Sequence, residues 1–215
     1  RKFYSSKSLY SLEYYIHYVK EIIPLFLSVN GKTKKVLVMD CDNTLWGGIL
    51  GEDGFDGIKM DKSSVPGKIF HEIQHILLNL KNQGVLLAIC SKNNLEDVEN
   101  VFNNHPEIVL KLDDFASIKI NWNEKSDNII QISKELNLGI DSFVFIDDNP
   151  VECVKVRERL PAVFTPTIPK DKMLLPSLIK NLSCFDTVSI TTEDRKRSDN
   201  YVLNKNGKQN NKNFS

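Results

Sequence analysis

Three short apolar runs, each followed at once by polar residues, constrain the fold of this chain more than any other feature. The runs occupy positions 36–39, 85–90 and 143–146. A continuous apolar run of this length is typical of a strand that is buried on both faces. Stretches with apolar residues at helical spacing lie between and after these runs, at 66–83, 95–102, 128–136 and 152–160. Because strands and helices alternate with short connections, we predict an α/β fold with a mostly parallel sheet between layers of helices.

The remaining segments extend this plan at both ends of the chain. We predict a lead-in helix within 1–34, a single α/β domain over 35–204 and a flexible tail or linker over 205–215, which is rich in Asn, Lys and Gly. The chain begins with Arg1, and we expect it to be a piece of a longer protein. Two further short strands are expected at 108–112 and 162–165.

Overall charge and cysteine spacing argue against several classes of function. Lys plus Arg and Asp plus Glu each total 28, so the formal net charge is zero and the basic excess of a nucleic-acid-binding protein is missing. No run approaches the roughly 20 apolar residues that a membrane span requires. The four cysteines match neither a zinc-binding pattern nor a CxxC motif. We therefore expect a cytoplasmic protein with reduced thiols and neither a nucleic-acid nor a membrane partner.

Acidic residues follow two of the predicted strands. Asp40 and Asp42 come after the first run, and Asp147 and Asp148 come after the third. Ligands of open parallel sheets bind beyond the carboxyl ends of the strands, so these carboxylates should gather at one edge. A divalent cation relieves such crowding of like charges, and Mg²⁺ prefers carboxylate and phosphate oxygens. We predict that these four residues bind Mg²⁺ for chemistry on a phosphorylated substrate; for Asp40 and Asp42 alone, two solvated acids in a turn are the alternative.

The first strand and the residues after it resemble motif one of the haloacid dehalogenase (HAD) superfamily; they read Val36-Leu37-Val38-Met39-Asp40-Cys41-Asp42-Asn43-Thr44. The resemblance implies that Asp40 is the nucleophile that takes the phosphoryl group and that Asp42 is the general acid/base. Ser91 resembles the motif-two residue whose hydroxyl binds phosphoryl oxygens. Lys125 resembles the motif-three lysine that neutralises charge, and Asp147-Asp148 resembles the motif-four acids that hold magnesium.

The same resemblance implies the architecture of the domain. HAD proteins have a Rossmannoid three-layer α/β sandwich, often with a cap over the site. In this chain the glycine-rich stretch 47–57 occupies the place of such a cap and is expected to be a loop or small hairpin. It is too short for a full cap domain, so we predict a site with little cover, which suits a bulky substrate.

Further motifs resemble the FkbH-like branch of this superfamily over roughly residues 35 to 201. They are Leu45-Trp46-Gly47-Gly48, Gly51-Glu52-Asp53-Gly54, Cys90-Ser91-Lys92-Asn93-Asn94, His105-Pro106-Glu107, Ile120-Asn121-Trp122, Lys125-Ser126-Asp127-Asn128-Ile129 and Phe145-Ile146-Asp147-Asp148-Asn149-Pro150-Val151-Glu152. The resemblance implies an enzyme of polyketide biosynthesis that takes a three-carbon unit from 1,3-bisphosphoglycerate and removes phosphate. The glyceryl or lactyl-type acyl group is then loaded onto the phosphopantetheine arm of an acyl carrier protein, within a multidomain synthase.

A thiol beside the acids makes a covalent acyl intermediate conceivable. Cys41 lies between Asp40 and Asp42, and a thiolate can displace phosphate from an acyl phosphate to form a thioester. Alternation along an extended strand would, however, turn Cys41 away from both acids and into the core. Cys90 is the second candidate, and it can equally be a core residue. The sequence leaves both alternatives open.

Five other residues are candidates for binding the substrate or its phosphate. Lys92 and Asn93 follow the second predicted strand and offer an ammonium and an amide. Trp46 is either a pocket wall or a packing residue, while Gly47 and Gly48 would let the backbone approach a ligand closely. Two other functions compete with acyl loading: a plain Mg²⁺-dependent phosphatase acting on a small phosphoester, and a non-catalytic docking domain of a synthase.

Overall fold

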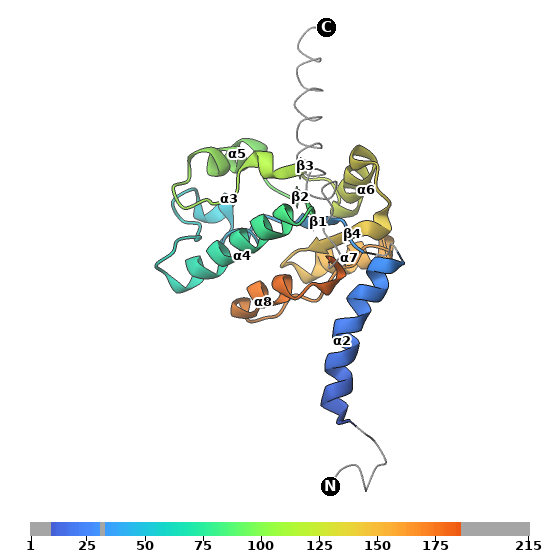
Figure 1. The fold of residues 1–215 in the computed structure, drawn as a ribbon. Coiled ribbons are helices and arrows are strands. Elements are labelled where there is room, and N and C mark those ends of the chain that lie inside the picture. Colours follow the sequence, from blue (N-terminus) through green and yellow to red (C-terminus); the bar gives the residue numbers. More distant parts are fainter. Residues whose placement is uncertain (1–9, 31–32, 186–215) are drawn as a thin grey trace. The chain divides into compact units, whose positions relative to one another are not determined.

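The computed structural model describes residues 10–30 and 33–185, which form two compact units (Figure 1). In the smaller unit, helix α2 (Leu12–Val29) contacts the short 3-10 helix η4 (Ser183–Phe185). The larger unit spans residues 34–181 of the described chain. The predicted tail 205–215 lies outside the described residues.

The larger unit is built on a four-stranded sheet in which all neighbouring strands are parallel. Its strands are β1 (Val36–Met39), β2 (Leu86–Ser91), β3 (Phe115–Ile120) and β4 (Phe143–Ile146). Their order across the sheet is β3-β2-β1-β4, so β1 is central. Every residue of β1, β2 and β4 is buried, as expected for strands covered on both faces.

Helices cover both faces of this sheet and complete the predicted three-layer sandwich (Figure 1). Val36 and Val38 of β1 belong to an apolar core with residues of α6 and α7. Leu37 and Met39 alternate to the opposite face, where α4 contacts β2 and α8 packs on α4. The helices are α3 (Leu50–Asp53), α4 (Val65–Asn82), α5 (Leu95–Asn104), α6 (Lys125–Leu136), α7 (Pro150–Arg159) and α8 (Leu175–Lys180), with 3-10 helices η1 (Leu112–Asp114), η2 (Ile140–Ser142) and η3 (Lys172–Leu174).

Two of the strand predictions were wrong. The stretch 108–112 forms no strand, because the amides of Val109 and Leu110 donate to the buried Gln74 side chain, at 2.8 and 3.3 Å, rather than to the sheet. The strand that was missed is β3, at one edge of the sheet; its polar Ser117 interrupts the apolar pattern and donates to Glu135 of α6. The stretch 162–165 contributes only an isolated bridge between Val144 and Phe164.

The segment between β1 and α4 is short, as predicted. It contains α3 and an antiparallel bridge between Gly47 and Lys59, and no large cap is present at this position in the described chain. None of the helices in the described ranges is both long and apolar enough to cross a membrane.

Candidate active site

The register of the neighbouring strands β1 and β4 places two acids side by side. β1 and β4 run parallel with Met39 opposite Ile146, so Asp40 and Asp147 are the next residues on each strand. The amide of Asp40 donates to the carbonyl of Ile146 at 3.0 Å, which extends the ladder to this point. The chain therefore fixes both carboxylates at the carboxyl edge of the sheet, where α/β folds bind their ligands.

Lys125, the first residue of α6, joins these two acids through its ammonium group. Its Nζ lies 2.8 Å from Oδ1 of Asp40 and 2.5 Å from Oδ2 of Asp147. Burial alone would lower the pKa of Lys125, but the two carboxylates raise it above its ordinary value. Burial and the nearby Asp40 raise the pKa of Asp147 to about 6, against the opposing effect of Lys125.

Asp148 adds a third carboxylate to this edge. One ligand oxygen from each of Asp40, Asp147 and Asp148 can be chosen so that all three lie within 4.8 Å of one another. Burial raises the pKa of Asp148, while Lys172 on η3, 3.4 Å from its Oδ2, lowers it. Three converging carboxylates form the donor set that a hard divalent cation neutralises, so these residues fit Mg²⁺.

Asp42 is held apart from that cluster by donors on other elements. Oδ1 accepts from the indole of Trp46 at 2.9 Å and from the amide of Leu50 at 3.0 Å, and Oδ2 accepts from the amide group of Asn93 at 2.9 Å. Burial raises the pKa of Asp42, and these three hydrogen bonds oppose that rise. Its carboxylate therefore lies outside the three-carboxylate group that could hold a metal in the described residues.

The residues after Asp42 form a tight turn that holds it in place. Asn43 has a φ of 51° and Gly48 a φ of 102°, both in the left-handed region, and Asn43 Oδ1 accepts from the Gly48 amide at 3.0 Å. Gly47 has no room for a side chain, since a Cβ would lie 2.6 Å from the ring of Phe70. Trp46 is fully buried and packs edge-on against Phe102. This packing fixes the indole that donates to Asp42.

A pocket of about 420 Å³ opens over this edge of the sheet. Six of the residues that the sequence analysis proposed for the site line it: Asp40, Asp42, Lys92, Lys125, Asp147 and Asp148. The other predicted binding residues lie outside its lining; they are Ser91, Asn93, Trp46, Gly47 and Gly48. Five lining residues were not among the predicted site residues: Asn43, Ile49, Asn149, Pro150 and Glu152.

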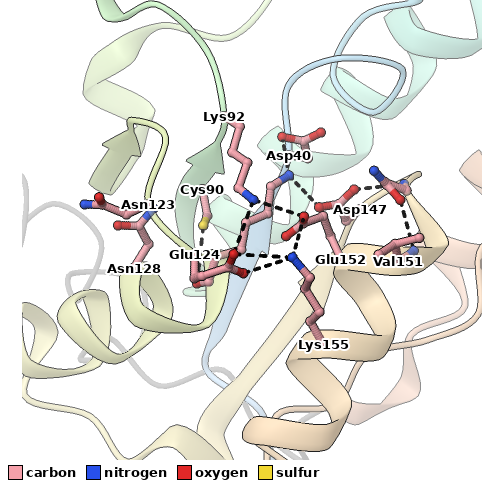
Figure 2. A network of polar contacts seen from close by, with 12 residues as sticks. Asp40, Cys90, Lys92, Asn123, Glu124, Asn128, Asp147, Val151, Glu152 and Lys155 are labelled. Carbon is pink, nitrogen blue, oxygen red and sulfur yellow. Dashed lines mark hydrogen bonds and ion pairs between the residues drawn. The ribbon is translucent and has the colours of Figure 1, made fainter.

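Glu152 was the most informative omission. It belongs to the stretch after Asp148 that carried the FkbH-like resemblance, and it lines the pocket as the third residue of α7. Figure 2 shows Glu152 between Lys92 and Lys155, beside Asp147. The sequence did contain a feature that could have identified Glu152 as a site residue: it is an acid in the first turn of the helix that follows β4, the strand that ends at Asp147.

Cys41 is packed in the core beneath the site and does not line the pocket. Its side chain is fully buried, and this burial, with Asp40 next in importance, raises the pKa of the thiol well above its ordinary value. Burial likewise raises the pKa of Cys90 to about 12, and the Cys90 thiol contacts the carbonyl of Lys125 at 3.7 Å. A neutral thiol is a poor nucleophile, so both cysteines have the properties of packing residues.

Comparison with solved structures shows a similar protein in Bacteroides fragilis. The matched structure is the N-terminal part of that protein, which contains a phosphatase domain and was crystallised with Mg. The two chains are 43% identical with a TM-score of 0.75, and the match covers 78% of the present chain but 45% of the other. A HAD-family enzyme from Bacteroides thetaiotaomicron, in complex with magnesium and inorganic phosphate, is 17% identical over 64% of the present chain and 96% of its own, with a TM-score of 0.43. No protein-family model and no curated protein matches the chain.

The parallel sheet, with acids at the ends of β1 and β4, gives the chain a three-layer α/β fold that it shares with the B. fragilis structure. The identity of 43% shows that the chain is related to the part of the B. fragilis protein that contains the phosphatase domain. The acidic cluster formed by Asp40, Asp147 and Asp148 can bind Mg²⁺, the ion with which that related protein was crystallised.

The buried position of Lys125 predicts a large effect on stability. Lys125→Met should lower the free energy of unfolding by about 3–5 kcal/mol without Mg²⁺, because it leaves two buried carboxylates unpaired. Added Mg²⁺ should restore part of this loss by neutralising the same acids. Urea denaturation with and without the ion measures both effects. Lys155→Met, in an exposed ion pair, is the control; an equal loss in the two variants would contradict this account.

Proposed function

We propose that this chain is a Mg²⁺-dependent enzyme of the HAD superfamily that transfers a phosphoryl group to Asp40. The observation that carries the proposal is that Asp40, Asp42 and Lys125 line one pocket with the acidic pair Asp147 and Asp148. One carboxylate would attack, a second would move the proton, and a buried ammonium would neutralise charge. These residues thus supply the nucleophile, the proton carrier and the positive charge for phosphoryl transfer through a covalent intermediate.

In the first step, a carboxylate oxygen of Asp40 attacks the phosphorus atom of the substrate. The new O–P bond forms while the bond from phosphorus to the leaving oxygen breaks. Lys125 stays paired with Oδ1 of Asp40, which orients the carboxylate and offsets negative charge on the transferred group. In the second step, water attacks the aspartyl phosphate, releases inorganic phosphate and regenerates Asp40.

Asp42 is the proposed proton carrier in both steps. Burial raises its pKa, so it can hold a proton to donate to the leaving oxygen. Once deprotonated, the same carboxylate accepts a proton from the attacking water. Its bonds to Trp46, Leu50 and Asn93 hold it in one orientation at the pocket wall.

Asp40, Asp147 and Asp148 would hold the magnesium ion. Mg²⁺ supplies charge neutralisation and a template for phosphoryl oxygens when it is bound. Lys172 already contacts Asp148 at 3.4 Å and the carbonyl of Asn43 at 3.3 Å, so a second ammonium lies at the same rim. Together these groups offset the negative charge that the substrate phosphate brings.

Kinetics with p-nitrophenyl phosphate test this assignment. Asp40→Asn should abolish Mg²⁺-dependent turnover because it removes the nucleophile. Asp42→Asn should lower kcat by about 10²–10⁴-fold, the usual contribution of a general acid/base. Asp127→Asn, an exposed acid on α6 outside the pocket, serves as the matched control. Wild-type rates in Asp40→Asn would refute the proposal.

The finer function that we propose is the FkbH-like loading of a three-carbon acyl group. In this scheme, 1,3-bisphosphoglycerate gives its ester phosphate to Asp40, and the thiolate of an acyl carrier protein attacks the acyl carbon. The new C–S bond forms as the C–O bond to the acyl phosphate breaks, and phosphate leaves. The resemblance of the motifs and the absence of a large cap over the described site support this scheme.

The geometry of Cys41 shapes this proposal. A fully buried thiol with a raised pKa is unsuited to carry an acyl chain, so we propose that the group passes directly to the carrier thiol. Because the chain spans 45% of the related B. fragilis chain, a carrier-protein partner, a multidomain synthase and a cytoplasmic location belong to the proposal for the whole protein.

Intact-protein mass spectrometry can test acyl loading. After incubation with 1,3-bisphosphoglycerate, Mg²⁺ and a carrier protein, we expect a three-carbon adduct on the carrier with both wild type and Cys41→Ala. An adduct that is lost specifically in Cys41→Ala would instead assign an acyl intermediate to that thiol. Phosphate release without any carrier adduct would favour the plain phosphatase.

A further inference from the structure

Two histidines of α4 (Figure 1) face each other outside the active-site pocket. His71 and His75 are four residues apart, so the helix places them on the same face, one turn above the other. Their Nε2 atoms lie 3.1 Å apart; His71 is half-buried and His75 is exposed. Because neither residue lines the pocket that holds the acids, the phosphoryl chemistry proposed above does not use this pair.

The orientation of the two rings fits a shared ligand better than a straight hydrogen bond. At the observed N···N distance of 3.1 Å, a straight N–H···N bond would hold the ring centroids about 5.4 Å apart, but they lie 4.7 Å apart. Two imidazole nitrogens at this separation, each about 2.0–2.1 Å from a single ion, would place the centroids about 4.8 Å apart. The Nε2 atoms are therefore spaced and turned as in a two-histidine chelate.

Both rings can offer a lone pair at Nε2. Burial, with His75 next in importance, lowers the pKa of His71, so this ring is neutral near pH 7. A neutral imidazole binds an ion through one nitrogen and carries its proton on the other. Nδ1 of His71 is buried with no hydrogen-bond partner in the described chain, so Nε2 is its accessible nitrogen, while the carbonyl of Met60 favours a proton on the ring. An ion at Nε2 therefore needs only a move of the shared proton to Nδ1.

The charged side chains around His71 leave this position open to a cation. Lys62 lowers the pKa of His71 and would repel a cation, whereas Glu107 raises that pKa and would attract one. The two opposite charges thus offset each other. No third histidine, cysteine or acid of the described chain lies close enough to join the pair as a ligand, so water would complete the coordination of an ion.

We propose that His71 and His75 form a second metal site, which binds a divalent transition-metal ion such as Zn²⁺ or Ni²⁺. Imidazole nitrogens favour these ions, whereas Mg²⁺ favours the oxygen ligands of the acidic site, so the two sites differ in the metals that they select. The ion would join two successive turns of α4. Because α4 contacts β2 and packs on α8, an ion that binds only the folded chain raises its stability.

Isothermal titration with Zn²⁺, in excess Mg²⁺ that occupies the acidic site, tests this proposal. Wild type should bind Zn²⁺, and His71→Gln and His75→Ala should each weaken that affinity at least about 10-fold, the loss that even a residue supporting a metal ligand causes. His17→Gln, which changes an exposed histidine on α2, is the matched control and should keep the wild-type affinity. Circular dichroism shows whether each variant is folded.

Nuclear magnetic resonance of the histidine rings locates the ion directly in the same wild-type protein. Zn²⁺ should shift the ring signals of His71 and His75 and leave those of His17 unchanged. It should also raise the melting temperature of wild type but not of His75→Ala. Absence of Zn²⁺ binding to wild type would overturn the site. So would binding that both histidine variants keep and that Asp148→Asn removes, because the ion would then lie at the acidic cluster.

Discussion

The ammonium of Lys125, held between Asp40 and Asp147, is the interaction on which the rest of the site depends. The two acids follow the neighbouring strands β1 and β4, and the lysine begins α6, so one buried cation joins three elements of the fold. An ion buried in this way is favourable only when its partners are fixed and close. The parallel register of β1 and β4 provides that fixation, because it sets Asp40 and Asp147 one residue beyond paired positions.

This arrangement leaves an excess of negative charge at the site, and that excess determines which ligands the site favours. Lys125 neutralises about one of the carboxylates contributed by Asp40, Asp147 and Asp148, and burial raises the pKa values of the last two. A divalent cation and a phosphate together restore the balance, since the cation neutralises the acids and helps to bind the anion. Asp42 remains outside this cluster with its own donors, which suits a group that exchanges a proton rather than one that binds metal.

The sequence predicted the sheet and the acidic edge because both depend on local patterns. The buried strands appear in the sequence as apolar runs, and the carboxyl ends of parallel strands lie at the same edge of a sheet. The proximity of Asp40 and Asp147 could therefore be predicted from the sequence alone. The edge strand β3 was missed because Ser117 and Lys119 interrupt its apolar pattern and bond to Glu135 on α6. The orientation of Cys41, the donors to Asp42 and the place of Glu152 depend on side-chain packing between distant elements, which spacing along the chain does not encode.

The most direct test of this account is to locate the phosphoryl group on the protein. Wild type and Asp42→Asn would be incubated with acetyl phosphate and Mg²⁺, quenched in acid and digested for peptide mass spectrometry. Acetyl phosphate has a good leaving group, so the account predicts phosphate on Asp40 in both proteins, with a higher steady-state level in Asp42→Asn because hydrolysis has lost its base. Turnover of acetyl phosphate with Asp40 unmodified in both proteins, or phosphate on a different residue, would contradict the account.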